Sequence, residues 1–275
     1  GKTVTLPESG RITTTGRLVK MGQGTFELTA SGLGLTTQTQ SDQWDLKEGT
    51  LSLGKHDGSQ AYSDVVQPQS RLLTSGTLAE SGLASATLRF NFKDTYRLDP
   101  SLFDVSGNGN VNLLQAGPGT MIVDEALPIH GGMALRGGVV KLTDRGDLGD
   151  SVSAVDTGEG NANGVFEMAQ SSGERTFTRR VIGTGTLRKT GAGSVTLNDD
   201  RAHTGAHAYT PKALEVQNGT LTLATRCGRK RCVSKRSKPQ HRGRPLPTLC
   251  LRGTRRSPTR SSWGAKRSSA RARTA

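Results

Sequence analysis

The sequence has few cysteines and few aromatic residues. It holds 3 cysteines in 275 residues, all beyond position 225, and Phe, Trp and Tyr together make up 4%. The first 225 residues therefore contain no disulfide bond, which suits a chain that crosses an oxidising compartment unfolded. So few large rings, beside 36 glycines, favour many small stacked layers over a single thick hydrophobic core.

Long apolar runs and helical periodicity are also missing. No stretch of 18 apolar residues occurs, which excludes a transmembrane helix. No amphipathic pattern with a 3.6-residue period exceeds two turns, so we expect little helix. The sequence opens with Gly1-Lys2-Thr3-Val4, without a methionine or an apolar signal segment. We therefore expect a fragment or a processed product that lacks its signal peptide.

Acidic residues are absent from the last 50 positions. Residues 226–275 carry 17 of the 37 Lys and Arg and no Asp or Glu, whereas residues 1–225 carry 20 basic and 23 acidic side chains. The formal charge of +14 thus belongs to the tail. A segment rich in Arg, Ser and Pro cannot bury enough apolar surface to offset the entropy of ordering. We therefore predict a folded body over 1–225 and a disordered basic tail over 226–275.

Three explanations of this tail stay open. It is either a passive polycationic arm, a segment that binds polyanions such as nucleic acid or anionic lipid, or the product of a shifted reading frame. The lack of any periodicity in its Arg-, Ser- and Pro-rich sequence favours the shifted reading frame. Nucleic acid is expected as a partner only non-specifically, and only through 226–275.

What the body does contain is a glycine-punctuated pattern that occurs twice. Each copy is followed by Gly-Thr-Leu-x-Leu, at 49–53 and at 219–223, and its opening and closing glycines are 33 or 34 residues apart. Self-similarity at such a period predicts stacked repeats. The two copies have the same offsets, and their defining residues are Gly16, Leu18, Lys20, Gly22, Gly24 and Leu28, then Gly185, Leu187, Lys189, Gly191, Gly193 and Leu197.

Within each copy, apolar and polar residues alternate with period two over a few positions, which is typical of a short strand with one buried face. Glycines separate these strands, where a tight corner needs positive φ or has no room for a Cβ. Short strands, corners instead of hairpins and repetition at fixed length predict a parallel β-solenoid. An antiparallel β-sandwich is the alternative, but it gives no reason for the repeat.

The predicted solenoid covers residues 1–225 with about ten turns of roughly 20–25 residues each. The segment 55–70 lacks the pattern and is expected to protrude as a loop. The inward-facing ladder is predicted to comprise Leu18, Phe26, Leu28, Leu51, Leu53, Leu187, Val195, Leu197, Leu221 and Leu223.

The two copies resemble the autotransporter-associated β-strand repeat of Gram-negative bacteria, which reads Gly-x-Leu-x-Lys-x-Gly-x-Gly-Thr-x-x-Leu, then a polar loop and Gly-Thr-Leu-x-Leu. In the second copy, His203-Thr204-Gly205 stands where the family has Tyr-Thr-Gly, whereas Ala206-His207-Ala208 departs from its Gly-Thr-Thr. The first copy lacks this element, and a degenerate third unit is predicted at 137–143. Clear resemblance covers about 75 residues.

This resemblance implies a right-handed parallel β-helix, the passenger domain that such proteins export through a C-terminal outer-membrane barrel. Most such passengers are adhesins or surface virulence factors. No barrel is expected in this chain, because its C-terminus lacks alternating strands of roughly ten residues. The implied function is a non-catalytic adhesin fragment, surface-exposed or secreted. Two alternatives stay open: the stalk of an autotransporter serine protease whose catalytic module lies upstream, and a polyanion-binding protein that acts through its tail.

One candidate binding motif is the tripeptide Arg145-Gly146-Asp147, which follows the expected strand 139–142. On a protruding turn, its guanidinium and carboxylate can bridge the acidic pocket and the metal site of an integrin-like host receptor, and the glycine permits the bend. The alternative is a plain solvated turn.

No pattern for catalysis, cofactor binding or metal binding is found, so we expect neither an enzyme nor a cofactor. The sequence has no Gly-x-Ser-x-Gly, His-Glu-x-x-His or phosphate-binding loop. Some isolated groups lack the spacing or the further ligands of a metal or catalytic site. They are His203 with His207, Cys227 with Cys232 and His241, the carboxylate pairs Asp124-Glu125 and Asp199-Asp200, and 156–164, which is similar to a calcium-binding turn.

Overall fold

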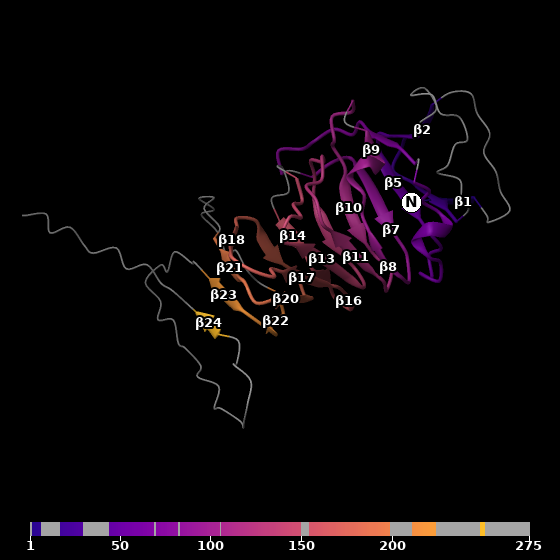
Figure 1. Cartoon of the computed structure of the whole chain (residues 1–275). Coiled ribbons are helices and arrows are strands. Elements are labelled where there is room, and N and C mark those ends of the chain that lie inside the picture. The colour runs from indigo at the N-terminus through magenta and orange to yellow at the C-terminus, as the bar shows by residue number, and fades with distance from the viewer. Residues whose placement is uncertain are drawn as a thin grey trace, which may run out of the picture.

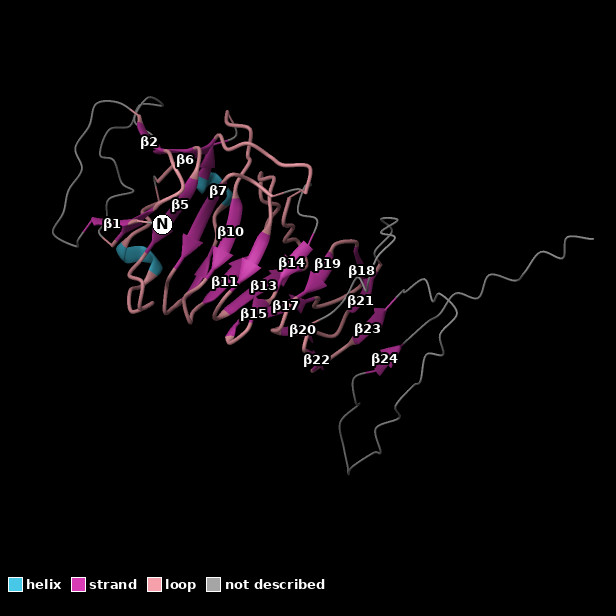
Figure 2. Cartoon of the chain, turned by 180° about the vertical axis from the view of Figure 1, so that it is seen from behind, coloured by secondary structure: helices cyan, strands magenta, loops and turns pink. Residues whose placement is uncertain are grey.

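The computed structural model describes residues 2–6, 17–29, 44–68, 70–81, 83–104, 106–149, 154–198, 211–223 and 248–250. These residues form a parallel β-solenoid of about seven turns, an elongated stack in which strands of successive turns lie side by side (Figure 1). In this part of the chain the only helices are two short 3-10 segments, η1 (Tyr62–Asp64) and η2 (Pro100–Leu102) (Figure 2).

Four sheets of the described residues form the sides of the stack. The eight-stranded sheet contains, in stacking order, β1 (Thr3–Leu6), β3 (Thr25–Leu28), β5 (Gly49–Leu53), β7 (Ala86–Phe90), β10 (Asn112–Gln115), β12 (Met133–Leu135), β14 (Ala154–Asp156) and β19 (Arg180–Ile182). The six-stranded sheet contains β8 (Thr95–Arg97), β11 (Thr120–Val123), β13 (Val139–Thr143), β17 (Val165–Ala169), β20 (Thr186–Thr190) and β22 (Ala213–Val216).

The remaining two sheets have four strands each. The N-terminal four-stranded sheet contains β2 (Leu18–Lys20), β4 (Trp44–Leu46), β6 (Leu72–Thr74) and β9 (Phe103–Asp104). The C-terminal four-stranded sheet contains β18 (Glu174–Phe177), β21 (Ser194–Leu197), β23 (Thr220–Leu223) and β24 (Thr248–Cys250).

Strand direction decides between the two predicted folds. Every neighbouring pair of strands in these four sheets is parallel. The short antiparallel pair β15 (Gly158–Glu159) and β16 (Ala162–Asn163) stands outside them. β20 and β21, which a sandwich would pair as a hairpin, belong to different sheets. The parallel solenoid is therefore confirmed.

The stack has fewer turns than predicted, because some turns are longer than the expected length of roughly 20–25 residues. Along the eight-stranded sheet, Thr3 pairs with Thr25 and Thr25 with Thr50, but Thr50 pairs with Thr87, 37 positions later. The additional residues of that long turn include η1, whereas β6 is the counterpart of β4 in the preceding turn.

The segment 55–70, which we expected to protrude, packs onto the solenoid instead. Val65 is fully buried, and the ring of Tyr62 stacks on that of Tyr96 in β8 with the centroids 4.5 Å apart. The Tyr62 N–H also donates to the Asp94 carboxylate at 2.9 Å. The segment thus packs against β8, where the six-stranded sheet begins. The prediction was wrong because the buried residues of this segment are spaced irregularly, without the period-two signal of a strand.

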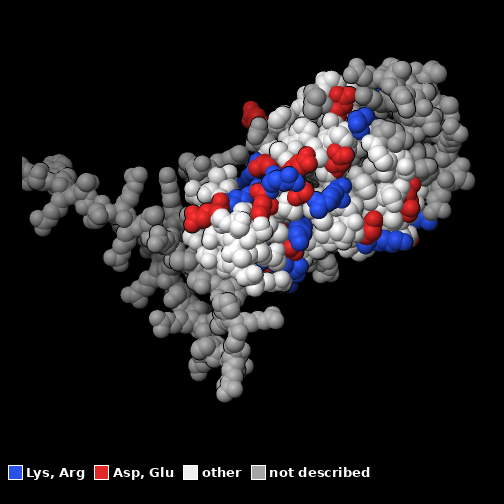
Figure 3. Space-filling model, viewed as in Figure 1, with Lys and Arg blue, Asp and Glu red and all other residues white. Residues whose placement is uncertain are grey.

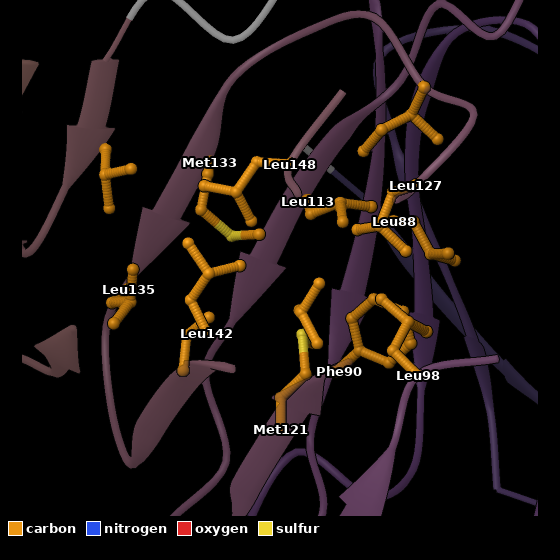
Figure 4. Close-up of a cluster of buried hydrophobic side chains, with 14 of the residues drawn as sticks. Leu88, Phe90, Leu98, Leu113, Met121, Leu127, Met133, Leu135, Leu142 and Leu148 are labelled. Atoms are coloured by element: carbon orange, nitrogen blue, oxygen red, sulfur yellow. The ribbon is translucent and has the colours of Figure 1, made fainter. Parts of the chain in front are cut away.

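Inward-facing side chains form one continuous core. All ten predicted ladder residues belong to it: seven are buried, while Leu18, Phe26 and Leu223 are partly buried and pack against the rest. Figure 4 shows part of this core, where leucines, methionines and Phe90 from successive strands lie close together. Fully burying one such side chain stabilises the fold by about 1.5–3 kcal/mol.

The C-terminal end of the described stack consists of β22, β23 and β24. Leu214 of β22 stands in the same inward column as Leu187 but is 39% exposed, because β22 is the last strand of its sheet in the described residues. Of the predicted basic tail, the structure describes Thr248–Cys250, which pair in parallel with β23 as β24. The rest of 226–275 lies outside the described residues.

Candidate functional site: the glycine corners and the Arg-Gly-Asp segment

In the first copy of the repeat, the lysine of the pattern caps the corner between two strands. Lys20 ends β2, and its Nζ donates to the carbonyl oxygens of Met21 at 3.0 Å, Gly22 at 2.7 Å and Glu48 at 2.9 Å. Met21 and Gly22 belong to the same corner, whereas Glu48 belongs to the corner of the next turn. Because an ammonium group has three donors, this one side chain ties two successive corners together.

Lys189 repeats this arrangement in the second copy. The Lys189 side chain is fully buried and stands in the inward column between Met168 of β17 and Val216 of β22. Burial lowers the pKa of its ammonium group. Its Nζ donates to three carbonyl oxygens, those of Thr190 at 2.5 Å, Gly191 at 2.8 Å and Asn218 at 3.4 Å.

The closing glycine of each copy occupies a place where a side chain does not fit. Gly49 has φ of +68° and Gly219 has φ of +71°, in the left-handed region that favours glycine. A Cβ at Gly49 would lie 2.2 Å from the Gly22 oxygen, and one at Gly219 would lie 2.2 Å from the Gly193 oxygen. Each closing glycine therefore rests on the backbone of the preceding corner.

A third corner of the same kind was missed in the sequence, because glutamine replaces the lysine. Gln115 ends β10, and its Nε2 donates to the oxygens of Gly117 at 3.0 Å and Gly119 at 3.3 Å. The Gly138 backbone, with φ of +55°, closes this corner, since a Cβ there would lie 2.2 Å from the Gly119 oxygen. The unit predicted at 137–143 is thus the closing strand of a repeat that opens at 113. The spacing Leu-x-Gln-x-Gly-x-Gly-Thr was the available signal.

These three corners connect different sheets. The first leads from β2 in the N-terminal four-stranded sheet to β3 in the eight-stranded sheet. The glutamine corner leads from β10 to β11 in the six-stranded sheet, and the Lys189 corner leads from β20 to β21 in the C-terminal four-stranded sheet. One sequence element therefore builds corners on several sides of the solenoid, and the repeat residues hold the stack together.

The tripeptide Arg145-Gly146-Asp147 follows β13, as predicted, but its backbone is held against the preceding turn. The Asp147 backbone N–H donates to the backbone carbonyl oxygen of Glu125 at 3.2 Å, and the backbone carbonyl oxygen of Asp147 accepts from the Leu127 N–H at 3.0 Å. A Cβ added to the glycine would lie 2.1 Å from the Val123 oxygen. The segment is a rung of the stack and not a freely protruding turn.

The carboxylate of Asp147 already has partners within the chain. Its Oδ1 accepts hydrogen bonds from Arg179 Nη2 at 2.9 Å and from the Gly149 N–H at 3.0 Å. Its Oδ2 lies 3.8 Å from Arg175 Nη2. A receptor metal ion that binds this carboxylate therefore competes with Arg179. The Arg145 side chain is 74% exposed, and its Nη2 lies 3.4 Å from the Asp124 carboxylate.

Two further aspartates bind across neighbouring turns beside the tripeptide. Asp124 accepts a hydrogen bond from the Thr143 hydroxyl at 2.5 Å and pairs with Arg97, and the Thr143 bond is the main cause that lowers the pKa of Asp124. Asp144 accepts from the backbone N–H and the hydroxyl of Ser171, which lowers its pKa in the same way. Carboxyl groups with lowered pKa values are ionised at neutral pH and do not act there as general acids.

The outer face of the six-stranded sheet carries a ladder of alternating charge, formed by Lys141, Glu167, Arg188 and Glu215 in consecutive strands. Lys141 Nζ lies 3.3 Å from Glu167, Arg188 lies 3.6 Å from Glu167, and Arg188 Nε donates to Glu215 at 2.8 Å. In Figure 3, basic and acidic side chains are intermixed over the visible face of the described residues. Opposite charges therefore meet between turns instead of collecting into a patch of one sign.

The remaining sequence candidates fall into two groups. Within 156–164, β15 and β16 form a small hairpin, and Asp156 pairs with Arg136 at 2.8 Å and accepts from the Gly158 N–H. Among the described residues, no group of three or more His, Cys, Asp or Glu side chains is arranged to hold a metal ion, and no helix is long and apolar enough to span a membrane. Outside the described residues lie His203, His207, Asp199, Asp200, Cys227, Cys232 and His241.

Comparison with known proteins identified no relative of this chain. No protein-family model matches the chain, and neither a curated protein nor a solved structure matches it.

Proposed function

We propose that this chain is a non-catalytic part of an autotransporter passenger domain, surface-exposed or secreted, in which the solenoid serves as an adhesin shaft. The observation that carries the proposal is the recurrence of one corner element along the stack, with its capping Lys or Gln and its closing glycine. This is the same element in which the sequence resembles the autotransporter-associated repeat.

The surface chemistry supports a mechanical role. The charged side chains that we described pair between successive turns, as in the ladder from Lys141 to Glu215 and in the contacts of Asp147. Such pairs link one turn to the next and do not converge on a common point where a substrate could be held. Because each turn contacts only its neighbours, a solenoid is lengthened by adding turns, which suits a rigid carrier.

Adhesion through Arg145-Gly146-Asp147 to an integrin-like host receptor is the second candidate, favoured by the exposed guanidinium of Arg145. The Asp147 carboxylate is less available to a receptor, since Arg179 and Arg175 contact it. A serine-protease stalk and a polyanion-binding tail compete with both candidates, and each of these functions predicts a different measurement.

Localisation tests the main proposal. An antibody against the full chain should label intact cells of the source bacterium or detect the protein in the culture medium, and the purified chain should bind host cells. Antigen confined to the cytoplasm, or no binding to any host cell surface, would overturn the proposal. Binding that is lost on heparinase treatment and falls steeply with salt would instead assign the activity to a polyanion-binding segment.

The substitution Asp147→Glu separates the tripeptide from the shaft. It keeps the charge but moves the carboxylate by one methylene, so integrin-dependent binding should disappear if the tripeptide is the ligand. Asp57→Glu is the matched control, because Asp57 is an exposed aspartate in another turn, where it accepts from the Ser59 N–H. Arg179→Gln removes the partner of Asp147 without changing the tripeptide. Unchanged cell binding by Asp147→Glu rejects the tripeptide and leaves adhesion to the shaft.

A further inference from the structure

Three asparagines in the described residues are followed by glycine: Asn108-Gly109, Asn163-Gly164 and Asn218-Gly219. In such a pair, the backbone nitrogen of the glycine can attack the Asn side-chain carbonyl carbon. A C–N bond forms to close a succinimide, and the C–NH2 bond breaks to release ammonia. Water then opens the ring to aspartate or isoaspartate. Glycine favours the attack because it has no Cβ to hinder the approach.

The fold holds two of these pairs in contacts that oppose the reaction. At the second pair, the Gly164 N–H donates to the Thr157 oxygen at 2.9 Å, and the Asn163 amide binds the Thr184 hydroxyl and the Gly160 oxygen. Both the nucleophile and the amide that it must reach are therefore engaged elsewhere.

The first pair is restrained through its side chain. Asn108 Nδ2 donates to the Gly76 oxygen at 2.8 Å, and Asn108 Oδ1 accepts from the Asn110 N–H at 3.0 Å. Rotation of this amide toward the nitrogen of Gly109 breaks both bonds, so the reaction at Asn108 is slowed by the cost of losing them.

The third pair is arranged differently. Asn218 is exposed, and within the described residues the one hydrogen bond of its side chain is to its own neighbour: the Gly219 N–H donates to Asn218 Oδ1 at 2.8 Å. The attacking nitrogen and the amide under attack are thus already in contact, with solvent at hand for the hydrolysis. We propose that Asn218 is a site of spontaneous deamidation, and that the fold makes it react ahead of Asn108 and Asn163.

The position of Asn218 gives this modification a structural consequence. Its backbone oxygen accepts from Lys189 Nζ at 3.4 Å, Gly219 rests on the Gly191 and Gly193 oxygens, and β23 begins at the next residue. Isoaspartate inserts one methylene into the main chain immediately before Gly219. The glycine then no longer meets both oxygens, and the pairing of β23 with β21 loosens. Deamidation at Asn218 therefore weakens the last complete corner of the described stack.

Peptide mapping by mass spectrometry tests the proposal on the full chain, aged at mildly alkaline pH and physiological temperature. Trypsin separates the three sites, because Lys or Arg residues lie between them. In the folded protein, Asn218 should deamidate several-fold faster than Asn108 and Asn163. In urea the three rates should converge, since each asparagine precedes a glycine. A folded-state rate at Asn218 that does not exceed those of Asn108 and Asn163, or the same ranking in urea, would overturn it.

Hydrogen exchange tests the consequence. After ageing, the amides of 220–223 should exchange faster, while those of 139–143 in the middle of the stack should not change. Asn218→Gln, which closes the corresponding ring far more slowly, should keep both segments protected over the same period. Unchanged exchange at 220–223 in chains that carry isoaspartate would refute the weakening of the corner.

Discussion

Replacing Lys189 by methionine isolates the contribution of the buried corner cap. Methionine preserves an unbranched side chain of similar length, and Met168 already occupies the equivalent position one turn earlier in the same inward column. The substitution is therefore expected to fit without a cavity. What it removes is the ammonium group and its hydrogen bonds to the corner carbonyls of Thr190, Gly191 and Asn218.

The expected change in the free energy of unfolding is the balance of two opposing effects. The bonds at 2.5 and 2.8 Å are short and charge-assisted, so together they are worth about 3–5 kcal/mol, while the bond at 3.4 Å adds little. The buried ammonium also carries a desolvation cost, on the order of a few kcal/mol, that methionine does not have and that offsets part of this gain. We expect a net loss of about 2 kcal/mol in the free energy of unfolding, which is a fall of about 4–8 °C in Tm for a body of this size.

Urea denaturation followed by far-ultraviolet circular dichroism measures this loss. Lys141→Met is the matched control, because Lys141 lies on the outer face and its pair with Glu167 is partly exposed, where such pairs contribute about 0–1 kcal/mol. Lys189→Gln should fall between wild type and Lys189→Met, since Gln115 performs the same task at another corner. If Lys189→Met costs no more than Lys141→Met, the lysine does not hold the corner.

Two further predictions concern a closing glycine and an aspartate. Gly138→Ala should lower the free energy of unfolding by about 3 kcal/mol or more, because its Cβ would lie 2.2 Å from the Gly119 oxygen. Gly173→Ala is the control, with similar φ but no atom within 4 Å of the added Cβ, and should lower it by only about 1–2 kcal/mol in the same denaturation experiment. Equal losses would contradict the stacked corner. Thr143→Val should raise the pKa of Asp124 toward its ordinary 3.8, as followed by NMR titration. A lowered folded-state pKa gives stability that is lost on acidification. Wild type should therefore lose more stability than Thr143→Val as the pH falls below about 4. Equal losses would contradict the role of the Thr143 hydroxyl.

Local signals in the sequence were sufficient to predict the β-solenoid architecture. Period-two alternation at 26–28, 51–53 and 195–197 marked inward side chains correctly, because in a strand the side chains of alternate residues share one face. The glycines marked corners correctly, since Gly22 and Gly191 have positive φ and the ease of adopting positive φ is intrinsic to glycine. These features depend on near neighbours in the chain, so they are readable without knowledge of how the turns stack.

Contacts between turns were decided only by the tertiary structure. That Lys20 reaches Glu48, that Arg179 binds Asp147 and that Tyr62 covers Tyr96 depends on the register of strands far apart in the sequence. This register is set by the lengths of the connecting loops, which vary from turn to turn and carry no periodic signal. The sequence by itself determined which residues face inward and where the chain turns; the stacking of the turns decided which carbonyls need a lysine and which carboxylates are already bound.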